Sequence, residues 1–260
     1  MPLVYLLTGA ILALYSLGSM FPGVAGNMLA DQIRKQYGPF SKLDVSVVTD
    51  PPIRALGGQV DSLRIKAEGF AVEGVPISTA SIETDPFHVD TGGALFGKTP
   101  TLKQPLEATV SAVLTEDGLN VLLNSPSVTK HLKGIQAQFS VIPGMSVTRT
   151  VDIVPGRLRL SQGRLSVDGN VDMGGGTRVP FALSAAPRLV GENQLAFSDI
   201  QASLFGSPIP PTMLGDAVNR PIDLSRFEAP GTTYRFTGLG VVPGRLWVDA
   251  RIGVSTLGGK

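Results

Sequence analysis

From residue 43 onward, apolar and polar side chains alternate along the chain with a period of two. In residues 63–68, for example, Leu63, Ile65 and Ala67 share one face, and Arg64 lies on the other. This alternation predicts antiparallel strands with one apolar and one polar face. Glycine- and proline-rich stretches such as "ALGGQ", "VEGVP" and "MGGGTR" separate the runs and predict turns. The clearest runs are residues 43–48, 63–68, 75–84, 105–114 and 135–142.

Helical periodicity is confined to a few segments. Residues 25–37 place Leu29, Ile33 and Tyr37 on one side of a helix that ends at Gly38. A second helix is expected after Thr115, whose side chain suits an N-cap and is followed by two acidic residues. We therefore expect an α+β fold, in which a strongly curved, mostly antiparallel sheet wraps around one or two short helices, preceded by an N-terminal apolar helix.

The pentapeptide VPGRL occurs twice, beginning at Val154 and at Val242. Proline fixes φ and glycine accepts positive φ, so each copy is expected to form a turn just before a strand. No helix follows either copy, which argues against a phosphate-binding loop. The alternation after each turn predicts that the arginines point outward and that the following residues point inward: Leu158, Leu160, Leu246 and Val248.

The first 29 residues contain no charged side chain. Residues 3–21 are long enough, at about 1.5 Å per residue, to cross most of a bilayer core of about 30 Å. Three interpretations are open: an uncleaved membrane anchor, a signal peptide cut near "GVAGN" that lacks the usual basic start, or a buried helix. Residues 1–24 are therefore expected to form an apolar helix, and residues 25–260 a single domain. Arg34, Lys35 and Lys42 follow the apolar segment and would keep the domain cytoplasmic by the positive-inside rule, but this signal is small and leaves the orientation open.

Composition narrows the classes of function. Charged residues make up 17% of the chain, against about 25% in an ordinary soluble domain, and the formal net charge is +1. That charge gives no basis for nucleic-acid binding. The absence of cysteine excludes disulfides, cysteine-ligated zinc and thiol nucleophiles. We expect neither a cofactor nor a metal.

Catalytic motifs are absent from the sequence. There is no G-x-S-x-G, H-E-x-x-H or Walker A pattern. His88 lies near Asp85 and Asp90, which could form part of a metal or acid–base site in an envelope hydrolase. The simpler interpretation of His88 is a polar strand position beside a loop, and we expect a protein that is not an enzyme.

The order of elements resembles that of the LmeA family of bacterial cell-envelope, phospholipid-binding proteins. The resemblance covers roughly residues 26–254. It is carried by the strand pair "VDSLRIKAEGFAVEGVPISTASIE", the strand and helix "ATVSAVLTEDGLNVLLNSPSV", and the ending "PIDLSRFEAPGTTYRFTGLGVVPGRLWVDARI". It implies an apolar groove or tube, lined by a curved sheet, that binds or transfers a phospholipid or another acyl-chain ligand. It also implies a membrane-associated protein, on the extracytoplasmic or periplasmic face.

The alternation of the strands agrees with this implication, because a sheet with one apolar face must bury it against something. An acyl chain could supply part of that cover. The alternative is an envelope structural or assembly protein whose sheet packs dry. The residues expected to form core and ligand wall together are Leu106, Val110, Leu122, Leu123, Phe139, Val141, Leu158, Leu160, Leu246 and Val248.

Overall fold

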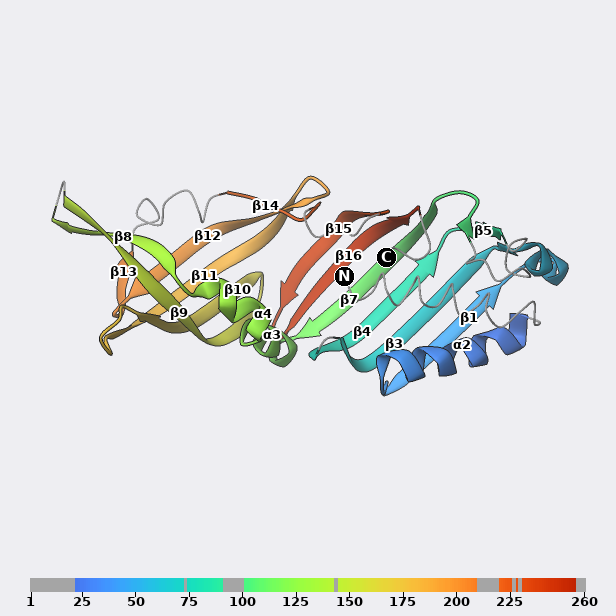
Figure 1. Cartoon of the computed structure of the whole chain (residues 1–260), viewed down its shortest axis with the longest axis horizontal. Coiled ribbons are helices and arrows are strands. Elements are labelled where there is room, and N and C mark those ends of the chain that lie inside the picture. Colours follow the sequence, from blue (N-terminus) through green and yellow to red (C-terminus); the bar gives the residue numbers. More distant parts are fainter. Residues whose placement is uncertain are drawn as a thin grey trace.

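The protein is an elongated molecule in which two large antiparallel sheets lie end to end (Figure 1). The computed structural model describes residues 22–72, 74–90, 101–142, 145–209, 220–225, 228 and 231–255. The apolar segment 3–21 lies outside these residues, and so does most of residues 210–221, where the sequence "PPTMLGDAVNRP" suggests a further short helix. Among the described residues, no helix is both long and apolar enough to cross a membrane.

The first sheet contains six strands in the order β1-β3-β4-β7-β16-β15. Its cross-strand rows follow the alternation in the sequence: Ile65 faces Ile82, which faces Val110, which faces Ala250. All four of these side chains are buried. The strands are β1 (Lys42–Val48), β3 (Ser62–Val72), β4 (Val75–Thr84), β7 (Leu106–Thr115), β15 (Thr232–Val242) and β16 (Arg245–Val254).

A helix and a small sheet complete the core of this half. Helix α2 (Pro22–Tyr37) begins three residues earlier than expected, and its Leu29 and Ile33 are buried in the core, as the helical spacing predicted. Gly26 lies so close to the carbonyl oxygen of Val45 that a β-carbon there would stand only 2.6 Å from it. The remaining elements are the 3-10 helix η1 (Pro52–Gly57) and the three strands β2 (Gln59–Val60), β5 (Phe87–Asp90) and β6 (Thr101–Leu102).

The second sheet is a meander of long hairpins in the order β13-β12-β11-β10-β9-β8, with β14 paired to β12. The glycine-rich "MGGGTR" stretch forms a hairpin turn between β10 and β11, as predicted, with three consecutive glycines at positive φ. The strands are β8 (Ile135–Ile142), β9 (Met145–Ser161), β10 (Arg164–Asp172), β11 (Arg178–Val190), β12 (Gln194–Leu204), β13 (Ser207–Ile209) and β14 (Ile222–Asp223).

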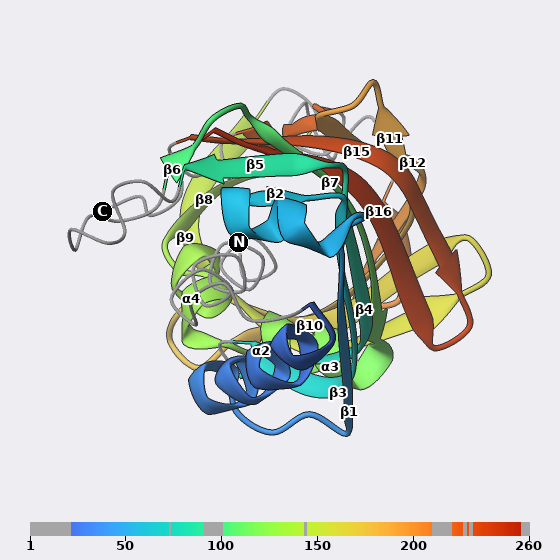
Figure 2. The same cartoon turned by 90° about the vertical axis from the view of Figure 1, so that its right-hand side faces the viewer.

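Seen along the long axis, the strands curl around that axis (Figure 2). The sheets are mostly antiparallel and strongly curved, and the described helices are few and short. The expected fold class is therefore confirmed for the described part of the chain.

The two sheets meet where hairpin turns of the second contact β15, the edge strand of the first. The amide of Gly163, in the β9–β10 turn, donates to the carbonyl of Val241 at 3.0 Å. The amide of Gly244 donates to the carbonyl of Leu160 at 3.2 Å, and that of Phe236 donates to Glu192 at 2.7 Å. Backbone hydrogen bonds therefore join the sheets without a continuous strand ladder.

The two VPGRL copies have different conformations. In the second copy, Pro243 and Gly244 form the turn between β15 and β16, as predicted. In the first copy, Pro155 and Gly156 lie inside β9, so the prediction of a turn there was wrong. The physical reason is a bulge, at which the β9–β10 register shifts between Val167 and Gly169. A bulge accommodates Pro-Gly without ending the strand.

Candidate lipid-binding face

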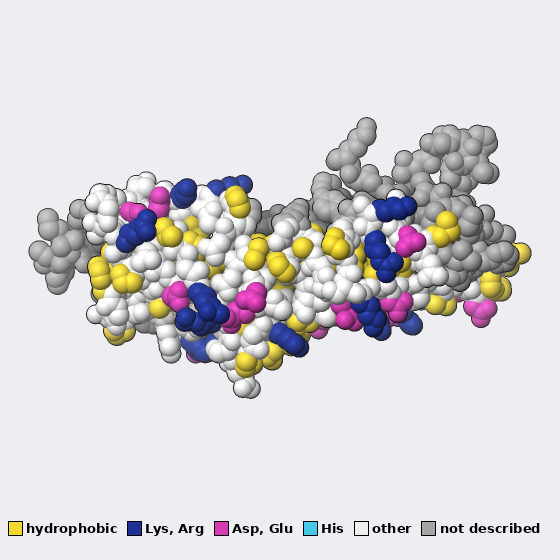
Figure 3. All heavy atoms as spheres, turned by 90° about the horizontal axis from the view of Figure 1, so that it is seen from below, with side chains coloured by type: hydrophobic (Ala, Val, Ile, Leu, Met, Phe, Trp, Pro, Cys, Tyr) yellow, Lys and Arg dark blue, Asp and Glu magenta, His cyan; other side chains and the backbone are white. Residues whose placement is uncertain are grey.

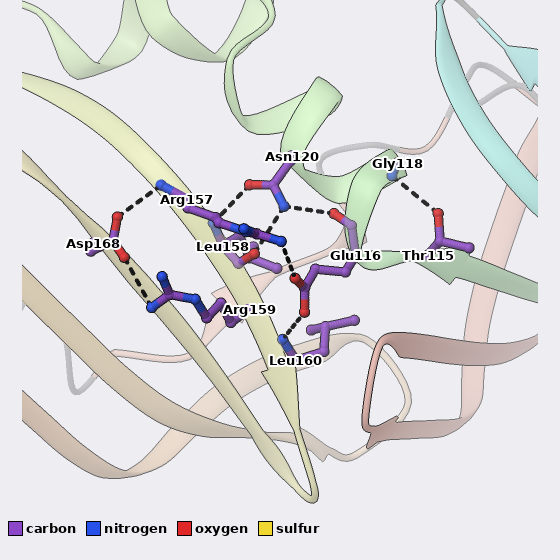
Figure 4. A network of polar contacts seen from close by, with 9 residues as sticks. All are labelled: Thr115, Glu116, Gly118, Asn120, Arg157, Leu158, Arg159, Leu160 and Asp168. Atoms are coloured by element: carbon purple, nitrogen blue, oxygen red, sulfur yellow. Dashed lines mark hydrogen bonds and ion pairs between the residues drawn. The ribbon is translucent and has the colours of Figure 1, made fainter.

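The helix α3 (Glu116–Leu123) lies at the junction of the two sheets and positions β9 (Figure 4). As predicted, Thr115 is its N-cap, and the Thr115 Oγ1 accepts a hydrogen bond from the amide of Gly118 at 3.1 Å. The amide of Glu116 donates to the carbonyl of Gly244 in the β15–β16 turn. The start of α3 is thus fixed to the first sheet. The chain continues through α4 (Pro126–Thr129) and the 3-10 helix η3 (Lys130–Leu132).

Two side chains of α3 bind the backbone of β9 beyond the point where β8 pairs with it. Asn120 accepts from the amide of Leu158 at 2.7 Å and donates to the carbonyl of the same residue at 2.8 Å. Glu116 accepts from the amide of Leu160 at 2.9 Å and lies 3.3 Å from the guanidinium of Arg157. The pairing of β8 with β9 ends at Val151, so these side chains take the place of a neighbouring strand.

The bulge in β9 is held by a carboxylate on β10. Asp168 accepts from the amide of Arg157 at 3.0 Å, and its other oxygen lies 3.3 Å from the guanidinium of Arg159 (Figure 4). A β-carbon on Gly156 would stand 2.8 Å from the same carboxylate. The two arginines therefore have structural partners on the polar side, while Leu158 and Leu160 belong to the alternate, apolar positions.

The apolar face of the second sheet is more exposed to solvent than the apolar face of the first sheet. One cross-strand row runs over five strands, from β9 to β13, and pairs apolar residues throughout. Every member of this row is only partly buried among the described residues. We call this row the open row; it consists of Leu158, Val167, Leu183, Ala202 and Ile209.

The apolar faces of the two sheets meet at the junction. Val241 of β15 and Leu160 of β9 are both buried there, beside the hydrogen bonds that join the sheets. On β16, burial falls toward this point: Ile252 and Ala250 are buried, whereas Val248 and Leu246 are only partly buried. The exposed apolar surface therefore begins at the junction and continues along the second sheet.

The residues expected to line a ligand site fall into distinct environments. Leu106 and Val110 are in the core cluster of the first sheet. Leu160 is buried at the junction. Phe139 and Val141 belong to β8, but their side chains lie outside the described ones. The expected residues that are partly buried are Leu122 and Leu123 on α3, Leu158 on β9, and Leu246 and Val248 on β16.

Four members of the open row were absent from the sequence-based set, namely Val167, Leu183, Ala202 and Ile209. The alternation of Phe181, Leu183 and Ala185 along β11 was a signal that could have identified that strand's apolar face.

The hydrolase hypothesis finds little support in the geometry around His88. Its Nε2 atom lies 2.9 Å from the carbonyl oxygen of Gly57, so the imidazole has a hydrogen-bond partner in the backbone. Asp85 lies 2.8 Å from the guanidinium of Arg251. Among the described residues, no group of three histidine, aspartate or glutamate side chains could hold a metal ion.

Charged side chains on one described face of the molecule occur in small groups of mixed sign. Figure 3 shows one face on which basic and acidic side chains lie next to one another, with apolar side chains scattered between them. Cross-strand ion pairs such as Arg64–Glu83, at 2.7 Å, are of this kind. The described part of this face therefore offers no patch of a single sign for a polyanion.

Comparison with known proteins agrees with the resemblance seen in the sequence. No curated protein and no solved structure matches the chain significantly. A family model described as LmeA-like phospholipid-binding matches residues 18–251, nearly the whole chain. The protein, with its curved antiparallel sheets and exposed apolar row, belongs to the LmeA-like phospholipid-binding family.

Proposed function

We propose that this protein binds a phospholipid without catalysis, and that the acyl chains lie along the open row of the second sheet. The observation that carries the proposal is the open row itself: five apolar side chains in register across five strands, none of them buried. Membership of a phospholipid-binding family supplies the ligand class.

The dimensions of the open row suit an acyl chain. Neighbouring strands lie about 4.8 Å apart, so five strands span about 19 Å. One leaflet of a bilayer core is about 15 Å thick. Each methylene group removed from water contributes about 0.8 kcal/mol, so partial cover of such a row gives a useful binding free energy.

The site is proposed to extend past the junction onto the first sheet. Leu246 and Val248 of β16 are only partly buried there. Leu122 and Leu123, also partly buried, belong to α3, which connects β7 of the first sheet to the strands of the second. Leu106 and Val110 would support the wall from within the core. Phe139 and Val141 of β8 stay proposed members of the wall.

The proposed setting is the bacterial cell envelope. The family and the apolar segment 3–21 support membrane association, with an uncleaved anchor, a signal peptide and a buried helix as the alternatives for that segment. We propose that the protein lies on the extracytoplasmic or periplasmic face. Its proposed role there is to bind phospholipid, or to transfer it between membranes.

The test compares two neighbouring residues on opposite faces of β11. In the full-length protein, Leu183→Asn places an amide in the open row, whereas Ala182→Asn changes an exposed residue on the other face. Phospholipid bound per mole of protein is measured by lipid extraction and mass spectrometry, and uptake by a phospholipid with a fluorescent acyl chain. We expect Leu183→Asn to weaken uptake about tenfold and Ala182→Asn to leave it unchanged.

Two outcomes would contradict the proposal. If the unsubstituted protein carries no phospholipid and takes up none, the sheet packs dry and a structural role in the envelope is favoured. If Leu183→Asn and Ala182→Asn take up lipid equally well, the open row is not the site.

A further inference from the structure

The β12–β13 hairpin ends in an exposed aromatic residue. Its loop has two residues, Phe205 and Gly206, both with positive φ, of 54° and 77°. Positive φ at both positions is typical of a type I′ turn, which favours Asn-Gly or Asp-Gly. The side chain of Phe205 is nevertheless an aromatic ring, with 67% of the residue exposed.

Phe205 is unfavourable for folding on two counts. A bulky residue in the left-handed region is a backbone outlier, and an exposed ring leaves apolar surface in water. The turn is nonetheless well fixed, because the amide of Phe205 donates to the carbonyl of Pro180 at 3.0 Å. A strained, exposed and fixed aromatic residue points to a role outside folding.

The hairpin lies at the end of the second sheet away from the first. The β9–β10 and β11–β12 turns contact β15 through Gly163 and Glu192, so the opposite ends of these strands face away from the junction (Figure 1). The turns at that end, residues 173–177 and 205–206, contain no charged residue. Asp172 and Arg178, which flank the first of these turns, form an ion pair with each other at 3.7 Å, so these turns carry no unpaired charge of one sign. Turns of this kind suit the interface of a neutral bilayer better than an anionic surface.

The hairpin also borders the apolar face of the sheet. Leu204, the last residue of β12, pairs with Phe181 of β11, and both are partly buried. Ala202, two residues before Leu204, belongs to the open row. Apolar surface therefore continues from the open row to the tip of the hairpin.

We propose that Phe205 inserts into the surface of a phospholipid bilayer and holds the end of the second sheet against it while lipid is exchanged. This inference rests on the proposed lipid-binding function. The partner is a neutral phospholipid surface, recognised by burial of the ring rather than by charge. Contact at this tip places the apolar face next to the acyl chains of the membrane.

The main test uses Phe205→Asn in the full-length protein. Asn-Gly is favoured in a type I′ turn, so this variant is expected to fold with unchanged or higher stability. The matched control is Ile53→Asn, which removes an equally exposed apolar side chain, 70% exposed, from η1 beside the first sheet. Uptake is measured from neutral phosphatidylcholine vesicles, and separately from a short-chain phosphatidylcholine below its micellar concentration.

We expect Phe205→Asn to slow uptake from vesicles by about tenfold or more, as for the loss of one buried aromatic side chain, and to leave uptake of the monomeric lipid unchanged. Uptake from vesicles at the parental rate would overturn the inference, as would an equal loss in Ile53→Asn. If the parental protein takes up neither form of lipid, the proposed function fails and the inference falls with it.

A local measurement complements the rates. Phe205→Trp keeps an aromatic ring at the tip and adds an emission signal to that of Trp247, the only tryptophan of the chain. Vesicles with brominated acyl chains should quench the added emission more strongly than that of the parental protein. Equal quenching in the two proteins would show that position 205 stays in water.

Discussion

Rows of apolar residues cross both large sheets, but only one sheet has its row covered. In the first, Ile65, Ile82 and Val110 belong to a core that also contains Leu29 and Ile33 of α2. In the second, the open row has no buried member among the described residues. The strands of both sheets have the same alternation of apolar and polar residues. The difference in burial therefore comes from the elements that cover each sheet. An alternating strand thus provides an apolar face, and its neighbours decide whether that face becomes core or binding surface.

The largest expected effect tests the packing difference directly. Leu63→Ala, at a fully buried position of β3, should lower the free energy of unfolding by about 3–4 kcal/mol, because it leaves a cavity in a closed core. Leu183→Ala, in the open row, should cost about 1 kcal/mol, since its side chain is already partly in water. Denaturant unfolding of both variants measures the contrast. Similar losses would mean that the two sheets are packed alike.

The next effect concerns how α3 connects the halves. Asn120→Ala removes both hydrogen bonds to the backbone of Leu158 and should destabilise the protein by about 2 kcal/mol. Asn124→Ala is the control, because that exposed side chain only donates to the carbonyl of Asn120. Amide hydrogen exchange at Leu158 should accelerate in the first variant alone. Unchanged protection there would show that the strand keeps its position without the helix.

A smaller effect is expected at the edge strand of the first sheet. Trp247 covers Gly240 of β15 so closely that a β-carbon on the glycine would stand 2.4 Å from the indole nitrogen. Gly240→Ala should displace the ring, shift the tryptophan emission to longer wavelength and cost about 1 kcal/mol. Gly57→Ala, where no atom lies within 4 Å of the added carbon, should change neither quantity. An unshifted emission in Gly240→Ala would place the ring elsewhere.

The smallest effects are expected on the polar faces, where the two sheets should behave alike. Arg64→Ala removes an ion pair of the first sheet and Arg159→Ala one of the second, and both pairs are exposed. Each should cost at most about 0.5 kcal/mol, and less in high salt. A loss above about 1 kcal/mol in either variant would show that the difference between the sheets extends to their charged side.

Local features of this structure were accessible from the sequence. The alternation predicted the strands and their faces, and Thr115 with its acidic followers predicted the cap of α3. The pairing of strands was not accessible, because alternation fixes a side chain's face and not its partner. Residues 106–115 pair with residues 245–254, more than a hundred positions away, and nothing local indicates this.

The candidate site shows the same limit. Leu106 and Leu158 occupy equivalent positions in alternating runs, yet the first is fully buried and the second is not. The burial of these leucines depends on α2 and the small sheet, which pack against the first large sheet. The bulge at Gly156 likewise depends on Asp168 of the next strand, so Pro-Gly alone was an ambiguous signal.

The contacts of Glu116 and Asn120 with β9 also bear on how molecules of this protein behave toward one another. A strand edge with free amide and carbonyl groups is a template on which a strand of a second molecule can add, and a neighbouring apolar face makes such growth more favourable. The α3 side chains occupy the backbone groups of Leu158 and Leu160 from within the same chain. In this stretch of the sheet, a helix therefore covers the backbone groups that an added strand would need.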